Sequence, residues 1–411
     1  MSSPSGSVPG MEISDRLRIA VVTESFLPTR NGVTTSVCRI LEHLSRRGHD
    51  TIVICPGPAP ETYAGAPVIS VPSVPYREFP VGMPSRRVIQ ALAAFRPDVV
   101  HLASPFVVGA RGITAAAQLG IPALAAYQTD VPGFATRHHA GVLAAPAWRW
   151  IRRLHEQAEV TLAPSTASMI SLAGHGVPRL ALWPRGVDQT RFTPQRRSSE
   201  RVQQRRKELA PHGEVLVGYI GRLALEKQVE RLKVLVDVPG IRLVVGGDGP
   251  ARHGLGRTLR QLDPVFLGWL DGDDLADAYA LLDIFVHTGT AETFGQTIQE
   301  AMATGIPVIA PACGGPLDLI RPGVTGLHYQ PDDDNELRDA VTALSYNEAF
   351  RRSLGEAGHA SVQDRTWQAL GDQLITHYRS VIAAFARQAP AACVLPGLPP
   401  TRHAMRFMRI R

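Results

Sequence analysis

Two cations stand close together at one point of the chain, in the stretch GRLALEKQ. Arg222 directly follows an apolar segment, and Lys227, one of only three lysines, comes five residues later. Gly221 permits a tight turn between segment and loop. A guanidinium and an ammonium on one loop can grip a diphosphate from two directions. Surface ion pairs of Lys227 with Glu226 or Glu230 are the simpler alternative when the pair is taken alone.

Two glutamates with seven residues between them form a second candidate group, in the stretch TAETFGQTIQEAMATG. The run between Glu292 and Glu300 is typical of a loop entering a helix, with Thr293 as the candidate N-cap. Phe294 and Gly295 offer backbone for close approach, and the helix N–H groups would face phosphates. Helical spacing puts the carboxylates roughly 9–12 Å apart, about the distance from a sugar past a diphosphate to a ribose. Alternatively, Glu300 is an ordinary exposed helix residue and Glu292 a partner of the helix dipole.

Polar residues after two apolar segments of the first half form a third group. Gly32 follows Asn31 in FLPTRNGVTTSV, where the glycine would let backbone N–H groups approach a phosphate. Asn-Gly is also a common turn signal, so a purely structural role is the alternative. Gln128 and Asp130 end another apolar segment, in AYQTDVPGF. Such polar groups serve a site or cap a loop, and the sequence favours neither.

These residues depend on short strands to bring them together. Apolar, β-rich segments alternate with helical stretches, and nearly continuous apolar strands are typical of parallel sheets covered on both faces. The expected strands are 18–23, 51–56, 98–104, 122–129 and 160–165, followed by 215–221, 241–247, 265–270, 284–289 and 307–311. The predicted fold class is α/β, with two doubly wound Rossmann-like parallel sheets. Because ligands of such sheets bind at the carboxyl ends of strands, the cleft between the two sheets is the expected site.

The same segments divide the chain into parts. A polar, basic stretch without apolar periodicity separates the two halves and is the best linker candidate. A long helix follows the second sheet, and the tail beyond it has several prolines and no acidic residue. The expected parts are a disordered N-terminus (1–17), an N-terminal Rossmann-like domain (18–190), a linker (191–213), a C-terminal domain (214–365), a C-terminal helix packing back towards the N-terminal domain (366–386) and a basic mobile tail (387–411).

Composition limits the kinds of partner and site that this protein is expected to have. The net charge of +6 favours anionic partners such as nucleotides, nucleic acid or an acidic membrane surface. Four cysteines without C-x-x-C spacing argue against a disulfide framework or a zinc site and suit a reducing cytosol. Gly247 and Gly249 begin a G-x-G-x-x-G pattern, but Arg252 replaces the third glycine, so a nicotinamide fingerprint is not supported.

Taken in order, the motifs resemble those of retaining glycosyltransferases of family 4, which have the GT-B fold. The resemblance rests on NGV after the first strand, GR followed by EK, a GDGP turn, FLGWL, and the two glutamates leading into EAMATGIPVIA. It covers nearly everything from Arg18 to Ala386. Within the family, ESFLPTRNGVTTSV, DVVHLASP, AYQTDVPGFA and LAPSTASM are most similar to actinobacterial GDP-mannose-dependent α-mannosyltransferases that extend glycolipids.

The resemblance implies roles for these residues by position. Arg222 and Lys227 would bind the donor diphosphate and stabilise the departing nucleotide. Glu292 would hold the donor sugar near the reacting carbon, and Glu300 would hold the ribose hydroxyls. The expected catalytic residues are thus Glu292, Arg222 and Lys227. Further expected donor contacts are backbone groups of Gly32, Phe294 and Gly295, the base-framing Trp269 and Leu270, and Asp271 or Asp273 as the reader of guanine.

One position departs from the family pattern, because many members place a histidine where Gln128 stands. Gln128 could still hydrogen-bond the sugar, but an amide cannot serve as an acid or a base. Asp130 is then the nearest ionisable neighbour, and its role stays open. Both are expected on the side of the acceptor and the transferred sugar, in the N-terminal domain.

The activity implied is transfer of mannose from GDP-mannose to a glycolipid acceptor such as glucuronosyl diacylglycerol, with retention of configuration. No metal or other cofactor is expected, and the partners are a nucleotide-sugar donor and a lipid-linked sugar at the membrane surface, without nucleic acid. The expected location is cytoplasmic and peripheral to the membrane, since no apolar run approaches the roughly 20 residues that span a bilayer. The alternatives are a family 4 transferase using a UDP-sugar or another acceptor, a phosphorylase on this fold, and a non-enzymatic nucleic-acid-binding protein.

Overall fold

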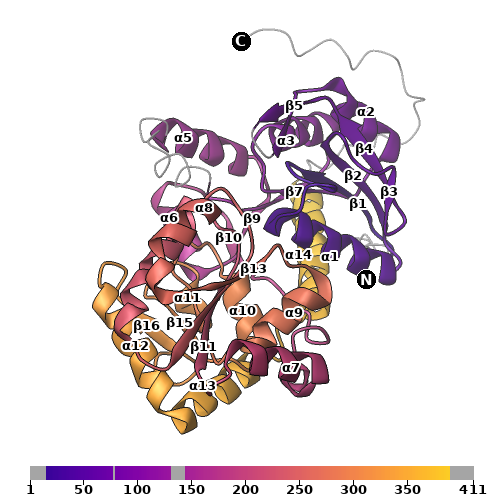
Figure 1. Ribbon diagram of the computed structural model, residues 1–411. Helices are drawn as coiled ribbons and strands as arrows, with labels where there is room; N and C mark the ends of the chain where they lie inside the picture. Colours follow the sequence, from indigo (N-terminus) through magenta and orange to yellow (C-terminus); the bar gives the residue numbers. More distant parts are fainter. Residues whose placement is uncertain (1–14, 77–78, 131–143, 389–411) are drawn as a thin grey trace, which may run out of the picture.

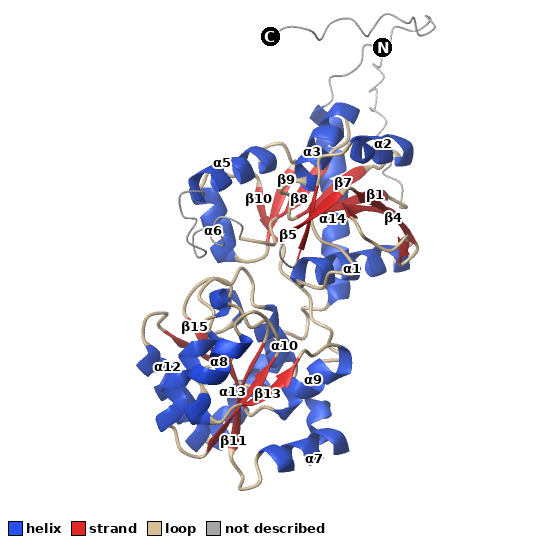
Figure 2. Ribbon diagram, turned by 45° about the horizontal axis from the view of Figure 1, so that its top comes forward, coloured by secondary structure: helices blue, strands red, loops and turns tan. Residues whose placement is uncertain are grey.

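The computed structural model describes residues 15–76, 79–130 and 144–388. These residues form two α/β domains, each built on a parallel sheet with helices on both faces (Figure 1 and Figure 2). All ten expected strands are present, so the predicted fold class is confirmed. None of the helices within these ranges combines the length and apolar character needed to cross a membrane. The expected N-terminus (apart from residues 15–17) and nearly all of the expected tail lie outside the described residues.

The N-terminal sheet has eight strands in the order β10-β9-β8-β7-β1-β2-β4-β3, and every neighbouring pair except β3 and β4 is parallel. Its strands are β1 (Arg18–Thr23), β2 (Asp50–Pro56), β3 (Thr62–Tyr63), β4 (Ala66–Val71), β7 (Val99–Ala103), β8 (Ala123–Ala126), β9 (Val160–Ala163) and β10 (Leu180–Leu182), with β5 (Ser73–Tyr76) and β6 (Phe79–Gly82) as a separate hairpin. Its helices are α1 (Gly32–Arg46), α2 (Arg86–Phe95), α3 (Val108–Leu119), α5 (Ala144–His155) and α6 (Thr166–Gly174).

The C-terminal sheet has six parallel strands in the order β13-β12-β11-β14-β15-β16. Its strands are β11 (Val215–Ile220), β12 (Ile241–Gly246), β13 (Val265–Gly268), β14 (Ile284–Val286), β15 (Val308–Pro311) and β16 (Leu327–Tyr329). The α-helices are α7 (Glu200–Leu209), α8 (Arg252–Thr258), α9 (Gly272–Leu281), α10 (Gln296–Ala303), α11 (Pro316–Leu319), α12 (Asp334–Tyr346), α13 (Glu348–Ser361) and α14 (Trp367–Gln388). The 3-10 helices are η2 (Pro194–Ser198), η3 (Leu225–Lys227), η4 (Val229–Asp237) and η5 (Arg260–Leu262).

The strands are apolar throughout because both faces of each sheet are covered. In β1, Ile19 and Val21 pack into one core cluster with residues of α1 and α14. The alternate residues Ala20 and Val22 pack into a second cluster with residues of α2 and α3. Since neither side of the strand meets water, the alternation of polar and apolar residues seen in half-exposed strands is lost.

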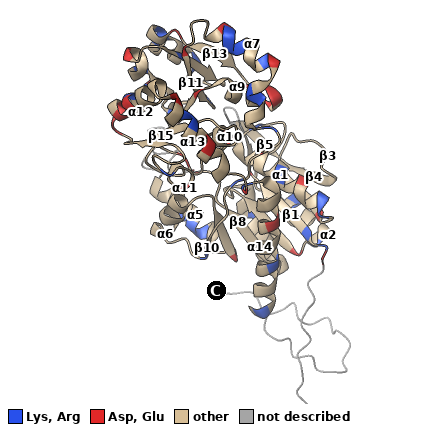
Figure 3. Cartoon of the chain, turned by 90° about the horizontal axis from the view of Figure 1, so that it is seen from below, with Lys and Arg blue, Asp and Glu red and all other residues tan. Residues whose placement is uncertain are grey.

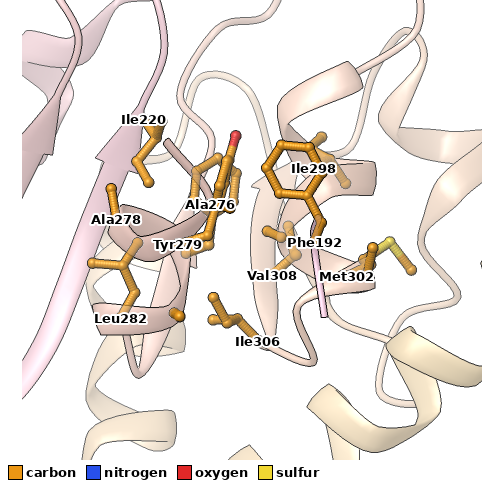
Figure 4. Close-up of a cluster of buried hydrophobic side chains, with 14 of the residues drawn as sticks. Phe192, Ile220, Ala276, Ala278, Tyr279, Leu282, Ile298, Met302, Ile306 and Val308 are labelled. Atoms are coloured by element: carbon orange, nitrogen blue, oxygen red, sulfur yellow. The ribbon is translucent and has the colours of Figure 1, made fainter. Parts of the chain in front are cut away.

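The segment before the C-terminal sheet is anchored in the core of that domain. Phe192 packs edge-on against Tyr279, with ring centroids 5.6 Å apart and an interplanar angle of 84°. Figure 4 shows both rings beside Ile298 and Val308, which come from α10 and β15. Residues of α10, the helix that follows the predicted donor-binding loop, pack into the same hydrophobic cluster.

The segment 191–213, expected as a linker, contains η2 and α7 and is bound to the C-terminal domain by ion pairs. Arg196 lies 2.7 Å from Asp277 of α9, and Arg206 lies 3.0 Å from Asp283, which is buried at the start of β14. The charged residues of α7 and α9 can be followed in Figure 3. The polar, basic composition of the segment therefore reflects partners on α9 and β14.

The last helix, α14, lies among elements of the N-terminal domain, where Figure 1 shows it in yellow beside α1. The carbonyl of Leu370 accepts a hydrogen bond from Nε1 of Trp183 at 3.0 Å. Asp372 lies 2.9 Å from Nε2 of His43 on α1. The chain thus crosses between the domains twice, and both crossings are held by side-chain hydrogen bonds.

Two glycine-bearing loops pack closely at the carboxyl edge of the C-terminal sheet. Gly247 adopts φ +118, and a Cβ there would lie only 1.9 Å from the carbonyl oxygen of Gly221. Gly249 packs against Leu223, and a Cβ there would lie 2.4 Å from the carbonyl oxygen of Leu223. The glycines that suggested an incomplete dinucleotide fingerprint therefore allow the loop after β12 to support the loop that carries Arg222.

We expect Gly247→Ala to destabilise the protein by about 3 kcal/mol or more, because the added methyl meets backbone and the φ angle is strained. Gly240→Ala is the matched control, since Gly240 also has a positive φ, +70, but nothing lies within 4 Å of its added Cβ. It should cost only about 1 kcal/mol. Chemical denaturation of both variants measures the difference, and equal losses would contradict the close-packing argument.

Candidate active site

The loop that carries the two predicted cations begins where β11 ends, at Ile220. The Arg222 side chain is 40% exposed and lies 3.4 Å from Glu226. Lys227 is the last residue of η3 and forms an ion pair with Glu292, in the loop after β14. Neither of the two local partners considered for Lys227, Glu226 and Glu230, is its ion-pair partner here, and Glu226 pairs with Arg222.

Lys227 and Glu292 form the electrostatic centre of the site. Nζ of Lys227 lies 2.8 Å from Oε2 of Glu292, which Nε2 of His287 approaches at 3.8 Å. Burial by itself would raise the pKa of Glu292, but the charge of Lys227 and the hydrogen bonds outweigh it and lower the pKa to about 2. Burial lowers the pKa of His287 to about 4. At neutral pH Glu292 is therefore a carboxylate and His287 an uncharged imidazole.

Helix α10 begins directly after this pair, and its N-cap is Gly295 rather than the expected Thr293. Gly295 has φ +101, and no side chain caps the helix. That φ favours glycine because a side chain would be strained there. The carbonyl of Thr293 instead accepts a hydrogen bond from Oγ of Ser168, in the N-terminal domain, at 3.3 Å. The first turn of α10 thus presents backbone N–H groups beside the buried Phe294.

Glu300 lies within a hydrogen-bonded group on the same helix and is not a freely exposed residue. Its Oε2 accepts a hydrogen bond from the hydroxyl of Tyr279 at 3.0 Å, and its Oε1 accepts one from Nε2 of Gln296 at 3.3 Å. Burial raises the pKa of Glu300 to about 7, although both hydrogen bonds favour the charged form. A carboxyl whose pKa lies so far from its usual value is a frequent feature of functional sites.

The N-terminal domain contributes the residues expected on the acceptor side. Asn31 is the N-cap of α1, with its side-chain oxygen accepting from the N–H groups of Val33 and Thr34, and Gly32 is the first helical residue. Gln128 follows β8 and is 7% exposed. Asp130 accepts a hydrogen bond from the hydroxyl of Tyr127 at 3.2 Å.

Two residues of the site escaped the sequence analysis. His287 follows β14 and lies beside Glu292, but a single histidine at the end of an apolar strand gives little signal. Arg185 donates a hydrogen bond from Nη2 to Oε1 of Gln128 at 3.2 Å and approaches Gly32. The available signal was an arginine in the apolar stretch LWPRGVD, directly before the expected linker.

The residues expected around the base lie beside α9. Trp269 is 61% exposed. Together with Leu270 it lines a cavity of about 550 Å³ between α7 and α9. Asp271 accepts a hydrogen bond at 2.7 Å from Arg30, which comes from the opposite domain. Asp273 is paired with an arginine of η2 at 2.5 Å. Both candidate readers of guanine thus have arginine partners in this structure.

The groups gathered at the domain boundary suit one kind of ligand. An arginine and a lysine lie at a strand end, beside an uncapped helix and a fixed carboxylate. Cations and backbone N–H groups bind oxyanions, whereas a carboxylate accepts hydrogen bonds from hydroxyl groups. Such a set can hold a phosphate next to a polyhydroxylated ring. Within the described ranges, no group of three or more His, Cys, Asp or Glu residues could hold a metal ion.

Comparison with known families supports this chemistry. Residues 30–191 match the family described as Glycosyltransferase Family 4, and residues 200–361 match the family described as Glycosyl transferases group 1. A GDP-mannose-dependent alpha-mannosyltransferase of Mycolicibacterium smegmatis is 48% identical over 376 residues, covering 89% of this chain and 98% of that protein. A protein of the same name from Mycobacterium tuberculosis is 45% identical over 383 residues, covering 91% and 99%.

Solved structures agree on the fold. HepE from Anabaena, determined in complex with UDP, superimposes with a TM-score of 0.73 at 19% identity, covering 89% of this chain and all of that one. This likeness concerns the fold alone, and it confirms the predicted GT-B architecture.

We expect Lys227→Ala to lower the free energy of unfolding by about 1–3 kcal/mol, because it leaves the Glu292 carboxylate buried without its cation. The double variant Lys227→Ala with Glu292→Gln should recover much of that loss, since the unpaired charge is gone. Thermal and urea denaturation near pH 7 compare the two. A double variant less stable than the single one would contradict the proposed dependence of Glu292 on Lys227.

Proposed function

Because the chain belongs to the group 1, family 4 glycosyltransferases, we propose that it transfers mannose from GDP-mannose to a glycolipid acceptor such as glucuronosyl diacylglycerol, with retention of configuration. The observation that carries the proposal is the Lys227–Glu292 pair beside Arg222, at the carboxyl edge of the C-terminal sheet. The choice of donor is supported by relatives named GDP-mannose-dependent alpha-mannosyltransferases that match nearly the whole chain.

We assign the donor diphosphate to Arg222 and Lys227. An ammonium has three N–H donors, and Glu292 accepts one of them, so two remain for phosphate oxygens. The N–H groups at the start of α10 add uncharged donors for the same oxyanion. Because these groups are already in place, they stabilise the negative charge that develops on the leaving nucleotide without reorganising.

Glu292 is assigned to the donor sugar. Its lowered pKa keeps it ionised, so it accepts hydrogen bonds from sugar hydroxyls and does not act as a proton donor at neutral pH. Its negative charge also stabilises the positive charge that develops on the anomeric carbon as the bond to phosphate breaks. We propose that the acceptor hydroxyl attacks from the face that the phosphate leaves, and that the leaving phosphate takes the acceptor proton.

Gln128 is assigned to hydrogen bonding with a sugar hydroxyl. Its Nε2 is buried without a hydrogen-bond partner among the described residues, while its Oε1 is occupied by Arg185. The amide therefore has a donor left for a substrate oxygen. We propose that the acceptor approaches from the N-terminal domain, and the lipid part of that acceptor would place the reaction at the cytoplasmic surface of a membrane.

Arg222→Ala is expected to lower the rate of mannose transfer by about 10²–10³-fold, because one preformed charge facing the leaving group is removed. Lys233→Ala, which removes an exposed lysine of η4, is the matched control and should leave transfer unchanged. Release of GDP and formation of mannosylated lipid are measured with GDP-mannose, and UDP-glucose is tested in parallel. Unchanged turnover of Arg222→Ala would overturn the phosphate assignment, and preference for UDP-glucose would overturn the assigned donor.

Glu300 should make donor binding depend on pH near neutrality. If the ribose hydroxyls donate to the carboxylate, affinity for GDP-mannose falls about tenfold between pH 8 and pH 6, because Glu300 becomes protonated. Glu300→Gln should bind more weakly at pH 8 and lack this dependence, whereas Glu348→Gln, on the exposed start of α13, should behave as wild type. Calorimetric titrations with GDP-mannose at both pH values measure these affinities. An unaltered pH dependence in Glu300→Gln would exclude the assignment of Glu300 to the ribose.

The same group links pH to stability. Its folded-state pKa of about 7 lies above the ordinary value of 4.5, so the folded protein binds more protons than the unfolded chain between these values. Stability contributed by Glu300 therefore falls as the pH rises through this window. Glu300→Gln should lack that fall, which thermal denaturation across the same range tests independently of any substrate.

A further inference from the structure

Arg185 lies where the two domains meet, in the segment that follows β10. Its carbonyl accepts a hydrogen bond from Nε2 of Gln299 at 2.9 Å, and the carbonyl of Gly186 accepts one from Nε2 of Gln296 at 3.2 Å. The backbone of Arg185 is thus fixed to α10, on the donor side. Its guanidinium stays on the side of the N-terminal domain, where Nη2 donates to Oε1 of Gln128 at 3.2 Å.

The guanidinium also lies against the predicted donor contact at the start of α1. A Cβ on Gly32 would lie 2.8 Å from Nη1 of Arg185. Any other residue at position 32 would therefore have to displace the guanidinium. Arg185 and Gly32 together occupy the N-terminal side of the site, facing the loop of Glu292, whose charge acts on Arg185.

Arg185 forms no ion pair within the described part of the protein, although the charge of Glu292 acts on it from a distance. Nε of Arg185 is buried there without a hydrogen-bond partner, and so is Nε2 of the neighbouring Gln128. Burial lowers the pKa of Arg185, and the charge of Glu292 offsets this effect only in part. A guanidinium nevertheless stays charged in proteins. Arg185 is half-buried, and its Nε is cut off from water. Because a charge removed from water without an ion pair is costly, such a group usually has an anionic partner in the working state.

We propose that Arg185 is a third cation of the active site and that it binds a substrate oxyanion, with Nε2 of Gln128 as a second donor. Hydroxyl groups of a neutral sugar would not balance this half-buried positive charge, so we expect the ligand to carry a negative charge. A guanidinium presents parallel N–H groups that match a carboxylate or a phosphate.

The proposed function supplies two sources of such an oxyanion, and this inference rests on it. One is the diphosphate of the donor, which would add Arg185 to Arg222 and Lys227. The other is the carboxylate of a glucuronosyl acceptor, which would make Arg185 the residue that selects an acidic acceptor over a neutral one. Removal of the charge of Arg185 would weaken donor binding in the first case and acceptor binding in the second.

The test compares Arg185→Gln, which removes the charge, with Arg185→Lys, which keeps it. Arg242→Gln is the matched control, because Arg242 lies on β12 and pairs with Asp263. Calorimetry measures binding of GDP to each purified full-length variant, and transfer assays with GDP-mannose compare glucuronosyl diacylglycerol with the neutral glucosyl lipid. Melting temperatures show whether each variant is folded.

If the oxyanion is the donor phosphate, Arg185→Gln binds GDP at least tenfold more weakly, and KM for either lipid is unchanged. If it is the acceptor carboxylate, GDP binding is unchanged, and the preference of wild type for the glucuronosyl lipid falls at least tenfold. Arg185→Lys should show a smaller loss than Arg185→Gln in either case, because it keeps the positive charge. The proposal is overturned if folded Arg185→Gln retains wild-type GDP binding and acceptor preference. It is also overturned if only kcat falls, and equally for both lipids, because that result would mean that Arg185 merely positions Gln128.

Failure of the proposed function would look different. A wild-type protein that transfers no mannose to either lipid would refute that function, whereas GDP binding by the Arg185 variants would still report on the donor arm. Conversely, normal wild-type transfer with unaffected variants would refute only the role of Arg185.

Discussion

The ion pair between Lys227 and Glu292 is the interaction on which the site depends, because it joins two loops that are 65 residues apart in the chain. The loops meet only because β11 and β14 are neighbours in a parallel sheet, whose carboxyl ends share one edge. The pair fixes a carboxylate and a cation side by side. The loop after β12, which only glycine allows to approach Gly221, supports the same arrangement from the other side.

The two carboxyl groups of the site show how environment divides similar residues between roles. Both Glu292 and Glu300 are partly buried, and this burial favours the neutral acid in each. Glu292 has Lys227 against it, so the charged form wins and the pKa falls to about 2. Glu300 has a hydroxyl and an amide as partners, which compensate burial only in part, so its pKa rises to about 7. Near neutral pH, Glu292 therefore stays charged, while the protonation of Glu300 changes with pH.

The domains are joined by contacts that concentrate around this site. The segment after β10 passes from Trp183, held by α14, to Phe192, buried in the C-terminal core. Arg185 lies between these two anchors, with its backbone on α10 and its guanidinium beside Gln128. Arg30 and Asp271 add a contact between the domains near the expected base site. Exposed pairs of this kind contribute little stability, so the buried anchors hold the arrangement.

Periodicity and strand-end chemistry in the sequence were enough to determine the two parallel sheets, their ten main strands and the loops bearing Arg222, Lys227, Glu292 and Glu300. Strands β3, β4, β5, β6, β10 and β16 were not predicted. Strands β10 and β16 are only three residues long, and β4 is partly exposed, so none of these three offers a continuous buried apolar run. Gly295, not Thr293, begins α10, because the backbone torsion at that turn outweighs side-chain capping preference. Tertiary structure alone decided that Lys227 pairs with Glu292 and not with a nearby glutamate, and that Arg185 contacts Gln128. These are contacts between residues distant in the chain, and local sequence patterns encode no such distances.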